Sequence, residues 1–183
     1  SIANLNLTEF FLYRNINMTG SIQYHFKEMA YLSWISLNGC SFSCPGPEFH
    51  TKAPIWSLEL SKNKFERPIP SSWGQLSSLT SIFIDDNRFS SGLDVLLRLQ
   101  KLRYLYADLN CFSGSIPIIL TPELAYLGLA GNNFSGVMQN LGMGGGSVVI
   151  YDVRHNPNLR ANIEAIRYSH RVEGLISLYN SNS

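Results

Sequence analysis

The stretch LAYLGLAGNNFSG, residues 124–136, sets a pattern that the rest of the chain follows. Apolar residues stand at its first, fourth and sixth positions, an asparagine at the ninth and a phenylalanine at the eleventh. The same arrangement returns in LRYLYADLNCFSGSIP (102–117), LTSIFIDDNRFSSG (79–92) and IWSLELSKNKFERPIP (55–70). Weaker copies begin at Leu7, Leu32 and Val148, and a truncated copy begins at Val172.

The copies recur at nearly constant intervals. Their first positions fall at residues 7, 32, 55, 79, 102, 124, 148 and 172, which gives steps of 25, 23, 24, 23, 22, 24 and 24 residues. A short strand per unit, with Asn or Cys at position nine, identifies the unit as a leucine-rich repeat. We therefore expect residues 1–183 to form a single repeat domain, an α/β repeat solenoid of about 7–8 repeats.

Each position of the unit has a physical role in such a coil. The side chains at positions one, four and six are expected to point inward and stack on the next unit. The amide at position nine can satisfy backbone groups of the turn, which predicts a structural ladder. A phenylalanine at position eleven is expected to stack into a buried spine. The predicted ladder consists of Asn15, Asn63, Asn87, Asn110, Asn132 and Asn156, with Cys40 replacing asparagine in the second unit.

Several units continue beyond the spine as F-S-G-x-I-P, complete in CFSGSIP (111–117) and partial in NFSG (133–136) and FERPIP (65–70). The chain thereby resembles the 24-residue, plant-type class of extracellular leucine-rich repeats found in receptor-like ectodomains. The stretch IPSSWGQLSSL (69–79) is also similar to the repeats of kinetoplastid surface antigens. This resemblance implies a right-handed superhelix with a parallel β-sheet on its concave face and few true helices on the convex side.

Composition excludes several classes of protein. The net charge of +1 in 183 residues argues against nucleic-acid binding, which usually needs a basic excess. No apolar run approaches the roughly 20 residues that span a bilayer, so we expect no membrane insertion in this segment. No signal peptide is expected either. Because the predicted terminal coils lack polar caps, we expect a fragment of a longer ectodomain or a chain stacked against another.

Glycosylation sequons and cysteines favour a secreted or cell-surface location. The sequons are Asn6-Leu-Thr, Asn17-Met-Thr and Asn133-Phe-Ser. Cys40 and Cys44 are close enough in sequence for a small-loop disulfide, which secretion would favour. Cys111 is left over, and we expect it to be a buried free thiol.

The chain carries no recognisable catalytic constellation or cofactor motif. Its four histidines fall in different units, and no G-x-S-x-G is present. Cys40, Cys44 and His50 supply only three ligands at a spacing that matches no standard zinc site. Adjacent side chains on a strand exit face different ways, so Asp85 and Asp86 are expected to be solvated rather than a catalytic pair. We therefore expect no enzymatic activity, no cofactor and no metal.

The exposed positions of the predicted concave sheet are rich in aromatic residues. Such side chains on an open face are enriched at interfaces, although β-propensity alone also favours them in strands. Acidic residues flank them in the middle units. The predicted ligand-binding residues are Trp34, Trp56, Phe83, Asp85, Tyr104, Tyr106, Asp108 and Tyr126.

The sequence thus predicts a non-enzymatic module that recognises a protein or peptide through its concave face. A rival hypothesis is structural: copies of the chain stack end to end through uncapped cores and build an extracellular filament or matrix. An intracellular scaffold is a third alternative, which native protein without any glycan would favour.

Overall fold

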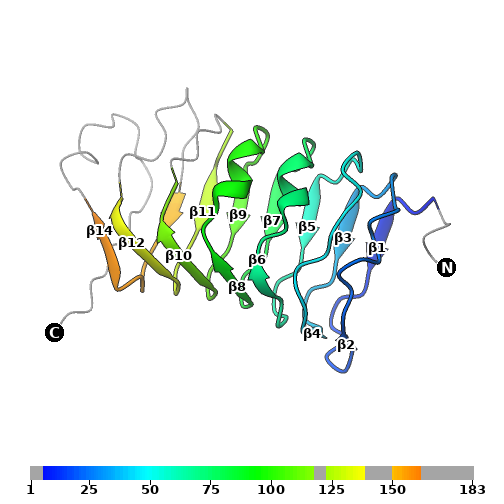
Figure 1. The fold of residues 1–183 in the computed structure, drawn as a ribbon, viewed down its shortest axis with the longest axis horizontal. Helices are drawn as coiled ribbons and strands as arrows, with labels where there is room; N and C mark the ends of the chain where they lie inside the picture. Colours follow the sequence, from blue (N-terminus) through cyan, green and yellow to red (C-terminus); the bar gives the residue numbers. More distant parts are fainter. Residues whose placement is uncertain (1–5, 118–122, 139–149, 162–183) are drawn as a thin grey trace.

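The computed structural model describes residues 6–117, 123–138 and 150–161 of the chain, which form an elongated array of similar coils (Figure 1). One strand from each coil joins a seven-stranded parallel sheet in which sequence order is also spatial order. Its strands are β1 (Glu9–Phe11), β3 (Trp34–Ser36), β5 (Ser57–Glu59), β7 (Ser81–Phe83), β9 (Tyr104–Tyr106), β11 (Tyr126–Gly128) and β13 (Ile150–Asp152).

The register of this sheet follows the repeat, because each strand covers positions three to five of its unit. Leu58 pairs with Ile82, and Ile82 pairs with Leu105, so the fourth positions of successive coils lie side by side. The expected parallel sheet of a leucine-rich-repeat solenoid is therefore confirmed. Seven strands enclose about six turns, slightly fewer than the 7–8 repeats expected, and the unit starting near residue 172 lies outside the described residues.

The opposite side of the coils is more regular than expected, because it carries sheets of its own. A five-stranded parallel sheet contains β6 (Glu66–Pro68), β8 (Arg88–Ser91), β10 (Cys111–Ser115), β12 (Asn133–Met138) and β14 (Asn158–Ala161). A separate pair joins β2 (Thr19–Gly20) to β4 (Ser41–Phe42). Helix in the described part is limited to two 3-10 turns, η2 (Ser71–Gln75) and η3 (Asp94–Arg98). The fold is thus a β-solenoid rather than a true α/β alternation.

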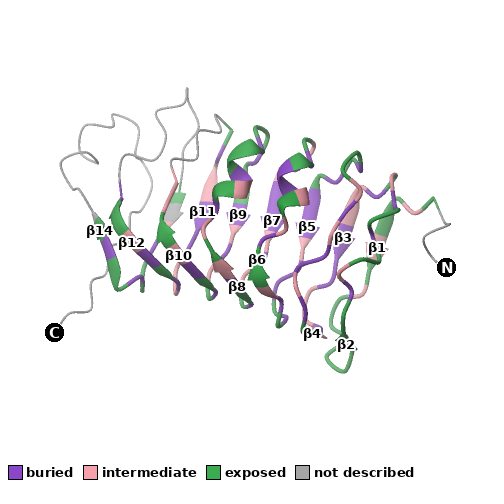
Figure 2. Cartoon of the chain, viewed as in Figure 1, coloured by how far each residue is buried: buried purple, intermediate pink, exposed green. Residues whose placement is uncertain are grey.

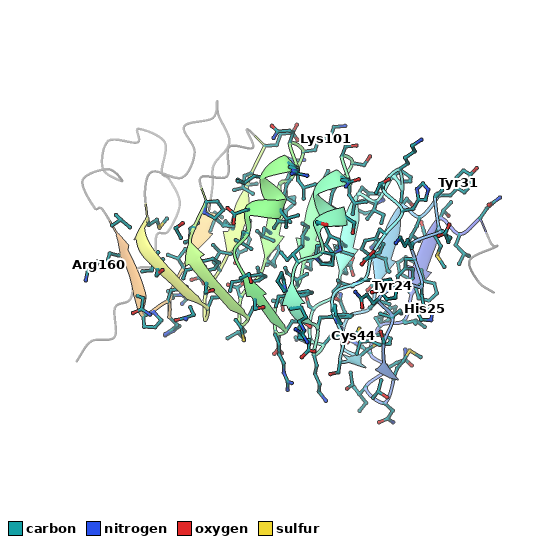
Figure 3. The ribbon with its side chains drawn as sticks, viewed as in Figure 1. Tyr24, His25, Tyr31, Cys44, Lys101 and Arg160 are labelled. Carbon is teal, nitrogen blue, oxygen red and sulfur yellow. The ribbon has the colours of Figure 1, made fainter. Side chains whose placement is uncertain are left out.

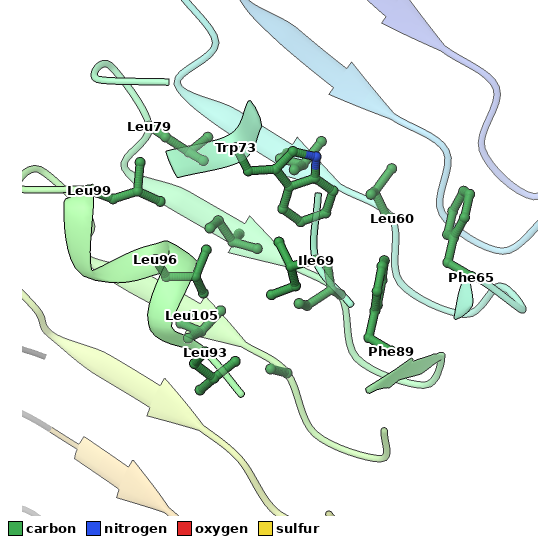
Figure 4. Close-up of a cluster of buried hydrophobic side chains, with 14 of the residues drawn as sticks. Leu60, Phe65, Ile69, Trp73, Leu79, Phe89, Leu93, Leu96, Leu99 and Leu105 are labelled. Atoms are coloured by element: carbon green, nitrogen blue, oxygen red, sulfur yellow. The ribbon is translucent and has the colours of Figure 1, made fainter. Parts of the chain in front are cut away.

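The core runs through the coils between the two larger sheets, where buried residues continue from one coil to the next (Figure 2). The two 3-10 turns cover one edge of the core in the middle of the array (Figure 1). There the buried Trp73 of η2 lies near Leu60 of its own coil and Leu79 of the next (Figure 4). The indole Nε1 of Trp73 donates a hydrogen bond of 2.8 Å to the carbonyl of Pro47, so its one polar atom is satisfied.

The phenylalanines at position eleven form the expected spine. Phe42, Phe65, Phe89, Phe112 and Phe134 are all buried, and consecutive rings stack with centroids 6.0–6.3 Å apart. Interplanar angles between 6° and 23° show that the rings repeat almost by translation. Each coil therefore buries the aromatic ring of its neighbour, which couples their stabilities.

Asparagines at position nine link the coils by hydrogen bonds. In the third coil, Asn63 Nδ2 donates to the carbonyls of Leu37 (2.7 Å) and Leu60 (3.1 Å), while its Oδ1 accepts from the amide of Phe42 (3.2 Å). Equivalent bonds recur at Asn87, Asn110, Asn132 and Asn156. Asn15 of the first coil is exposed and bonds only within its own turn, to Leu12 and Tyr13.

Cys40 and Cys44 do not form the expected disulfide. Both are buried free thiols. Cys40 occupies the ladder position instead of pairing, and its thiol donates to the carbonyl of Leu12 at 2.7 Å. Cys111 is free as expected but exposed rather than buried. It begins β10, and the alternation of a strand places its side chain opposite that of the buried Phe112.

Candidate functional site

The concave surface of the seven-stranded sheet is hollowed over its first four strands. An open groove of about 810 Å³ lies there, and we call it the N-terminal groove. Its lining comes from positions three, five, seven and eight of the first four coils: Phe11, Tyr13, Arg14, Trp34, Ser36, Asn38, Gly39, Glu59, Ser61, Lys62 and Asp85.

Hydrogen bonds hold the base of the N-terminal groove in one arrangement. One carboxylate oxygen of Glu59 accepts from Trp34 Nε1 at 2.9 Å, and the other accepts from Asn38 Nδ2 at 3.0 Å. Asn38 Oδ1 in turn accepts from the amide of Ser61 at 2.8 Å, and the Ser61 hydroxyl donates to Asp85. The groove therefore presents a preorganised floor, which lowers the entropic cost of binding.

Aromatic rings continue this floor at its edge. Trp34 meets Phe11 edge to face with centroids 4.8 Å apart, and it contacts Trp56 at 5.3 Å. The side chain of Trp56 is 44% exposed, so much of its ring is accessible from the groove. The two tryptophans thus offer apolar contact area to any segment that enters the groove.

Farther along the sheet, three stacked rings form what we call the aromatic ridge: Phe83, Tyr106 and Tyr126. The first two stack with centroids 4.9 Å apart and the last two with centroids 4.2 Å apart. Tyr104 lies next to the ridge, is 36% exposed and has the Arg103 guanidinium 5.8 Å from its ring centroid. Tyr104 is thus exposed beside a cation, whereas the three ridge rings are half-buried by their own stacking.

Gly128 makes room for the carboxylate beside the ridge. A Cβ at this position would lie 2.9 Å from Tyr126 Cε1 and would collide with Asp108 Oδ2. Without it, Asp108 reaches across to the next coil, where its Oδ1 accepts a hydrogen bond from the Ala130 amide at 2.8 Å. Desolvation, reinforced by the charge of Asp152, raises the pKa of Asp108 above its ordinary value.

The last described coil adds a charge pair to this end of the sheet. Arg154 Nε donates to Asp152 Oδ1 at 2.8 Å, and this hydrogen bond lowers the pKa of the Asp152 carboxyl. Burial, together with the charge of Asp108, raises the pKa of the Tyr126 hydroxyl to about 12. Tyr126 is therefore a neutral hydrogen-bond donor throughout the physiological range of pH.

The structure places all eight sequence-predicted binding residues on or beside this sheet, but in two groups. Trp34, Trp56 and Asp85 belong to the N-terminal groove and its edge. Phe83, Tyr106 and Tyr126 form the ridge, and Tyr104 and Asp108 lie beside it. Sequence reasoning missed the parts played by Arg14, Asn38 and Gly128. Their presence at positions five, seven and eight was the available signal.

The three sequon asparagines, Asn6, Asn17 and Asn133, are all exposed, and none lies in a strand of the seven-stranded sheet. Among the described residues, no group of three or more His, Cys, Asp or Glu side chains is placed to hold a metal ion. The part of the chain that the structure describes also has no helix long and apolar enough to cross a membrane.

Comparison with known proteins agrees with this geometry. Receptor-like protein 39 of Arabidopsis thaliana is 30% identical over 121 residues, which cover 64% of this chain and 14% of that protein. The crystal structure of a TDR receptor matches with a TM-score of 0.70 and 29% identity, over 79% of this chain and 25% of that one. The chain is similar to plant leucine-rich-repeat receptor proteins and has their solenoid fold. No family model matches it.

The module spans about one seventh of the length of the curated relatives it matches, since 14% of each is covered. The plant peptide hormone receptor RGFR1 in complex with RGF2 shares its fold, with a TM-score of 0.58 and 21% identity over 71% of this chain and 20% of that one. At this identity the likeness concerns the fold alone.

Proposed function

We propose that the module binds a protein or peptide ligand on the concave surface of its seven-stranded sheet, without catalysis. The observation that carries this proposal is the continuity of the N-terminal groove with the aromatic ridge across six adjacent strands. Exposed aromatic rings beside a preorganised polar floor are typical of interfaces. One protein of the same fold is the plant peptide hormone receptor RGFR1, whose structure was solved in complex with RGF2.

We further propose that the module works outside the cell, as part of a longer receptor-like protein. Similarity to a receptor-like protein supports this location. The exposure of Asn6, Asn17 and Asn133 supports glycosylation at all three sites. Because these residues lie outside the seven-stranded sheet, their glycans would leave the strands of the binding surface uncovered. Intact-mass measurement before and after glycosidase treatment of secreted protein tests the modification.

Ligand binding can be tested with a phage-displayed dodecapeptide library selected on the secreted module. Calorimetry of the strongest peptide would then compare the native protein with Tyr106→Ala, Tyr126→Ala and Trp34→Ala. Removal of an aromatic anchor from an interface typically costs about 1–3 kcal/mol, so affinity should fall roughly fivefold or more. Tyr24→Ala is the matched control, because Tyr24 is 63% exposed in the segment between β2 and β3, outside the seven-stranded sheet (Figure 3).

The rival structural function predicts a different outcome. Sedimentation velocity should show a monomer at all concentrations if the module is a recognition unit. Growth into larger species with concentration, unchanged by Tyr106→Ala, would instead support end-to-end assembly. Equal affinities of the selected peptide for native protein and for all three sheet variants would overturn the concave-face proposal.

A further inference from the structure

The N-terminal groove carries ionised side chains of both signs in equal number. Its lining contains the carboxylates of Glu59 and Asp85 together with the cations of Arg14 and Lys62. Among the described residues, none of these four side chains lies within ion-pair distance of an opposite charge. A ligand group of either sign would therefore meet a like charge as well as an opposite one. This balance favours a ligand without net charge.

The four ionised side chains keep hydrogen-bonding capacity toward the groove. A carboxylate offers about four lone-pair sites, of which Glu59 uses two and Asp85 one for neutral donors of the groove floor. The side chains of Arg14 and Lys62 are exposed and can only donate. A hydroxyl group both donates and accepts, so a ligand rich in hydroxyls can meet all four groups and replace the water that solvates them.

The backbone beneath the groove is already paired. The amides of Leu37, Gly39 and Leu60 donate to carbonyls of the next coil at 2.8, 2.9 and 2.7 Å. The strands β3 and β5 each pair with a neighbour on both sides. An added peptide strand needs a free sheet edge for its main-chain hydrogen bonds, whereas the groove lies on a sheet face. Recognition in the groove therefore depends on side chains.

Aromatic rings border this polar lining. Phe11 and Tyr13 line the groove and are exposed, and the exposed Trp56 lies at its edge. The indole N–H of Trp34 is bonded to Glu59, so Trp34 offers only the apolar part of its ring. A pyranose sugar has an apolar face of C–H groups and a rim of hydroxyls. Its face can pack on an aromatic ring while its rim meets the ionised side chains.

We propose that the N-terminal groove binds a short neutral oligosaccharide. Its sugar rings pack on Phe11, Tyr13 and Trp56, and its hydroxyls form hydrogen bonds with the four ionised side chains. The groove volume of about 810 Å³ lies within the roughly 300–1,000 Å³ that is usual for sites of small organic ligands. This inference goes beyond the proposed function, because it gives the groove a second class of ligand and leaves the aromatic ridge as the contact for a protein or peptide.

Calorimetric titration of the secreted module with four tetrasaccharides provides the test. Cellotetraose, mannotetraose and maltotetraose are neutral and differ in shape, whereas tetragalacturonate carries a carboxylate on every ring. We expect at least one neutral tetrasaccharide to bind saturably and about threefold or more tightly than tetragalacturonate, the worth of one charge contact at a surface. Its affinity should change by less than about twofold between about 0.05 and 0.5 M NaCl, because salt screens only interactions between charges.

Three variants locate the site within the groove. Tyr13→Ala and Trp56→Ala each remove one aromatic contact and should weaken binding of the best tetrasaccharide by about twofold to tenfold. Lys62→Met keeps the length of the side chain but removes its donors, and it should weaken binding by about threefold. All three side chains are exposed, so these variants should fold, which urea denaturation checks. Tyr24→Ala is the control and should leave the affinity unchanged.

The outcomes separate this inference from the proposed function. Tyr106→Ala should weaken the library-selected peptide without changing the affinity of the tetrasaccharide, because Tyr106 does not line the groove. Absence of saturable binding by all three neutral tetrasaccharides overturns the inference, and so does tighter binding of tetragalacturonate. Equal affinities of the native protein and the three groove variants overturn it as well, because the saccharide would then bind elsewhere. None of these results changes the outcome of the peptide experiment.

Discussion

Tyr106 and Tyr126 stack with ring centroids 4.2 Å apart and planes inclined by 20°, although they occupy different positions of their units. Tyr126 is a third-position residue, and its partner in the sheet register is Tyr104. It leans instead over the fifth-position Tyr106, whose register partner is Gly128. A missing side chain in one coil thus creates the aromatic ridge between two coils.

Gly128→Ala should disturb both the ridge and the carboxylate. The new Cβ would meet Tyr126 Cε1 at 2.9 Å and collide with Asp108, so one of them must move. We expect a loss of about 1–3 kcal/mol in the free energy of unfolding, measured by urea denaturation. The same substitution in an Asp108→Ala background should cost less, because the contact with the Asp108 carboxylate is removed and only the contact with Tyr126 remains. Equal costs in the two backgrounds would exclude the carboxylate as the obstacle.

The ladder predicts a contrast between two asparagines of the same repeat position. Asn87 is buried, donates to Leu60 and accepts from the Phe65 amide at 3.0 Å, whereas Asn15 is exposed and bonds only locally. Asn87→Ala leaves buried backbone groups unpaired and should lower the free energy of unfolding by about 2–4 kcal/mol. Asn15→Ala should cost less than about 1 kcal/mol. Comparable urea midpoints for the two variants would contradict a stabilising role for the hydrogen bonds that Asn87 makes to the preceding coil.

Position thirteen of the unit explains the glycine of the F-S-G motif. Gly114 and Gly136 adopt φ of 84° and 86°, while Ser91 and Arg67 occupy the same left-handed region at 68° and 71°. Gly114→Ala meets no atom within 4 Å, so its expected cost of about 1 kcal/mol is purely conformational. Ser91→Gly should relieve strain and stabilise the protein by about 0.5 kcal/mol, a change visible in thermal unfolding. Ser90→Gly, one residue earlier in β8, is the control, because Ser90 does not adopt a positive φ. The explanation is wrong if Ser91→Gly destabilises the protein as much as Ser90→Gly does.

Ionisation of the Tyr126 hydroxyl should make the free energy of unfolding depend on pH in the alkaline range. The pKa of Tyr126 is raised to about 12 from an ordinary value of 10.0, so the unfolded chain loses the hydroxyl proton first. Its contribution to stability is therefore complete below pH 10 and is lost as the pH rises toward 12. Tyr126→Phe should flatten the stability curve in that window, whereas Tyr24→Phe should not. The curve is measured by urea denaturation at stepped pH.

Acidic pH should act on the two neighbouring aspartates with opposite sign. The raised pKa of Asp108 means that its contribution is present at low pH and is lost as the pH rises through that pKa. The lowered pKa of Asp152 means that its contribution is present above its ordinary pKa and is lost as the pH falls. Asp108→Asn should therefore stabilise the protein near neutral pH relative to acid, while Asp152→Asn should do the reverse. Parallel pH profiles for these two variants would contradict both assignments.

Much of this architecture follows from the spacing of apolar, Asn and Phe residues in the sequence. Leu58, Ile82 and Leu105 lie side by side because each coil contacts its neighbour at the same repeat position. The ladder and the spine obey the same translation, as the nearly parallel Phe89 and Phe112 rings show. Contacts between equivalent positions about 24 residues apart can therefore be predicted from the repeat period alone.

Features that do not repeat from coil to coil could not be predicted in this way. The second sheet, the exposed Cys111 thiol and the free Cys40 and Cys44 depend on how each coil returns across the convex side. The left-handed turn at position eight, which Leu109 adopts at φ 53° while remaining 62% exposed, is likewise a demand of the backbone that its residue type does not announce. Steric accommodation between coils decides these features.

By itself, the sequence determined the coil, its period and which columns of residues face the concave surface, because those properties repeat. Only the tertiary structure decided how the exposed residues combine into sites. Glu59 accepts hydrogen bonds from Trp34 and Asn38 of the preceding coil, which joins side chains of two coils into one floor. The space left at Gly128 admits the Asp108 carboxylate, so the position of this carboxylate depends on side-chain size in the adjacent coil. Such pairings are set by packing and hydrogen bonding between particular neighbours, which no periodic pattern encodes.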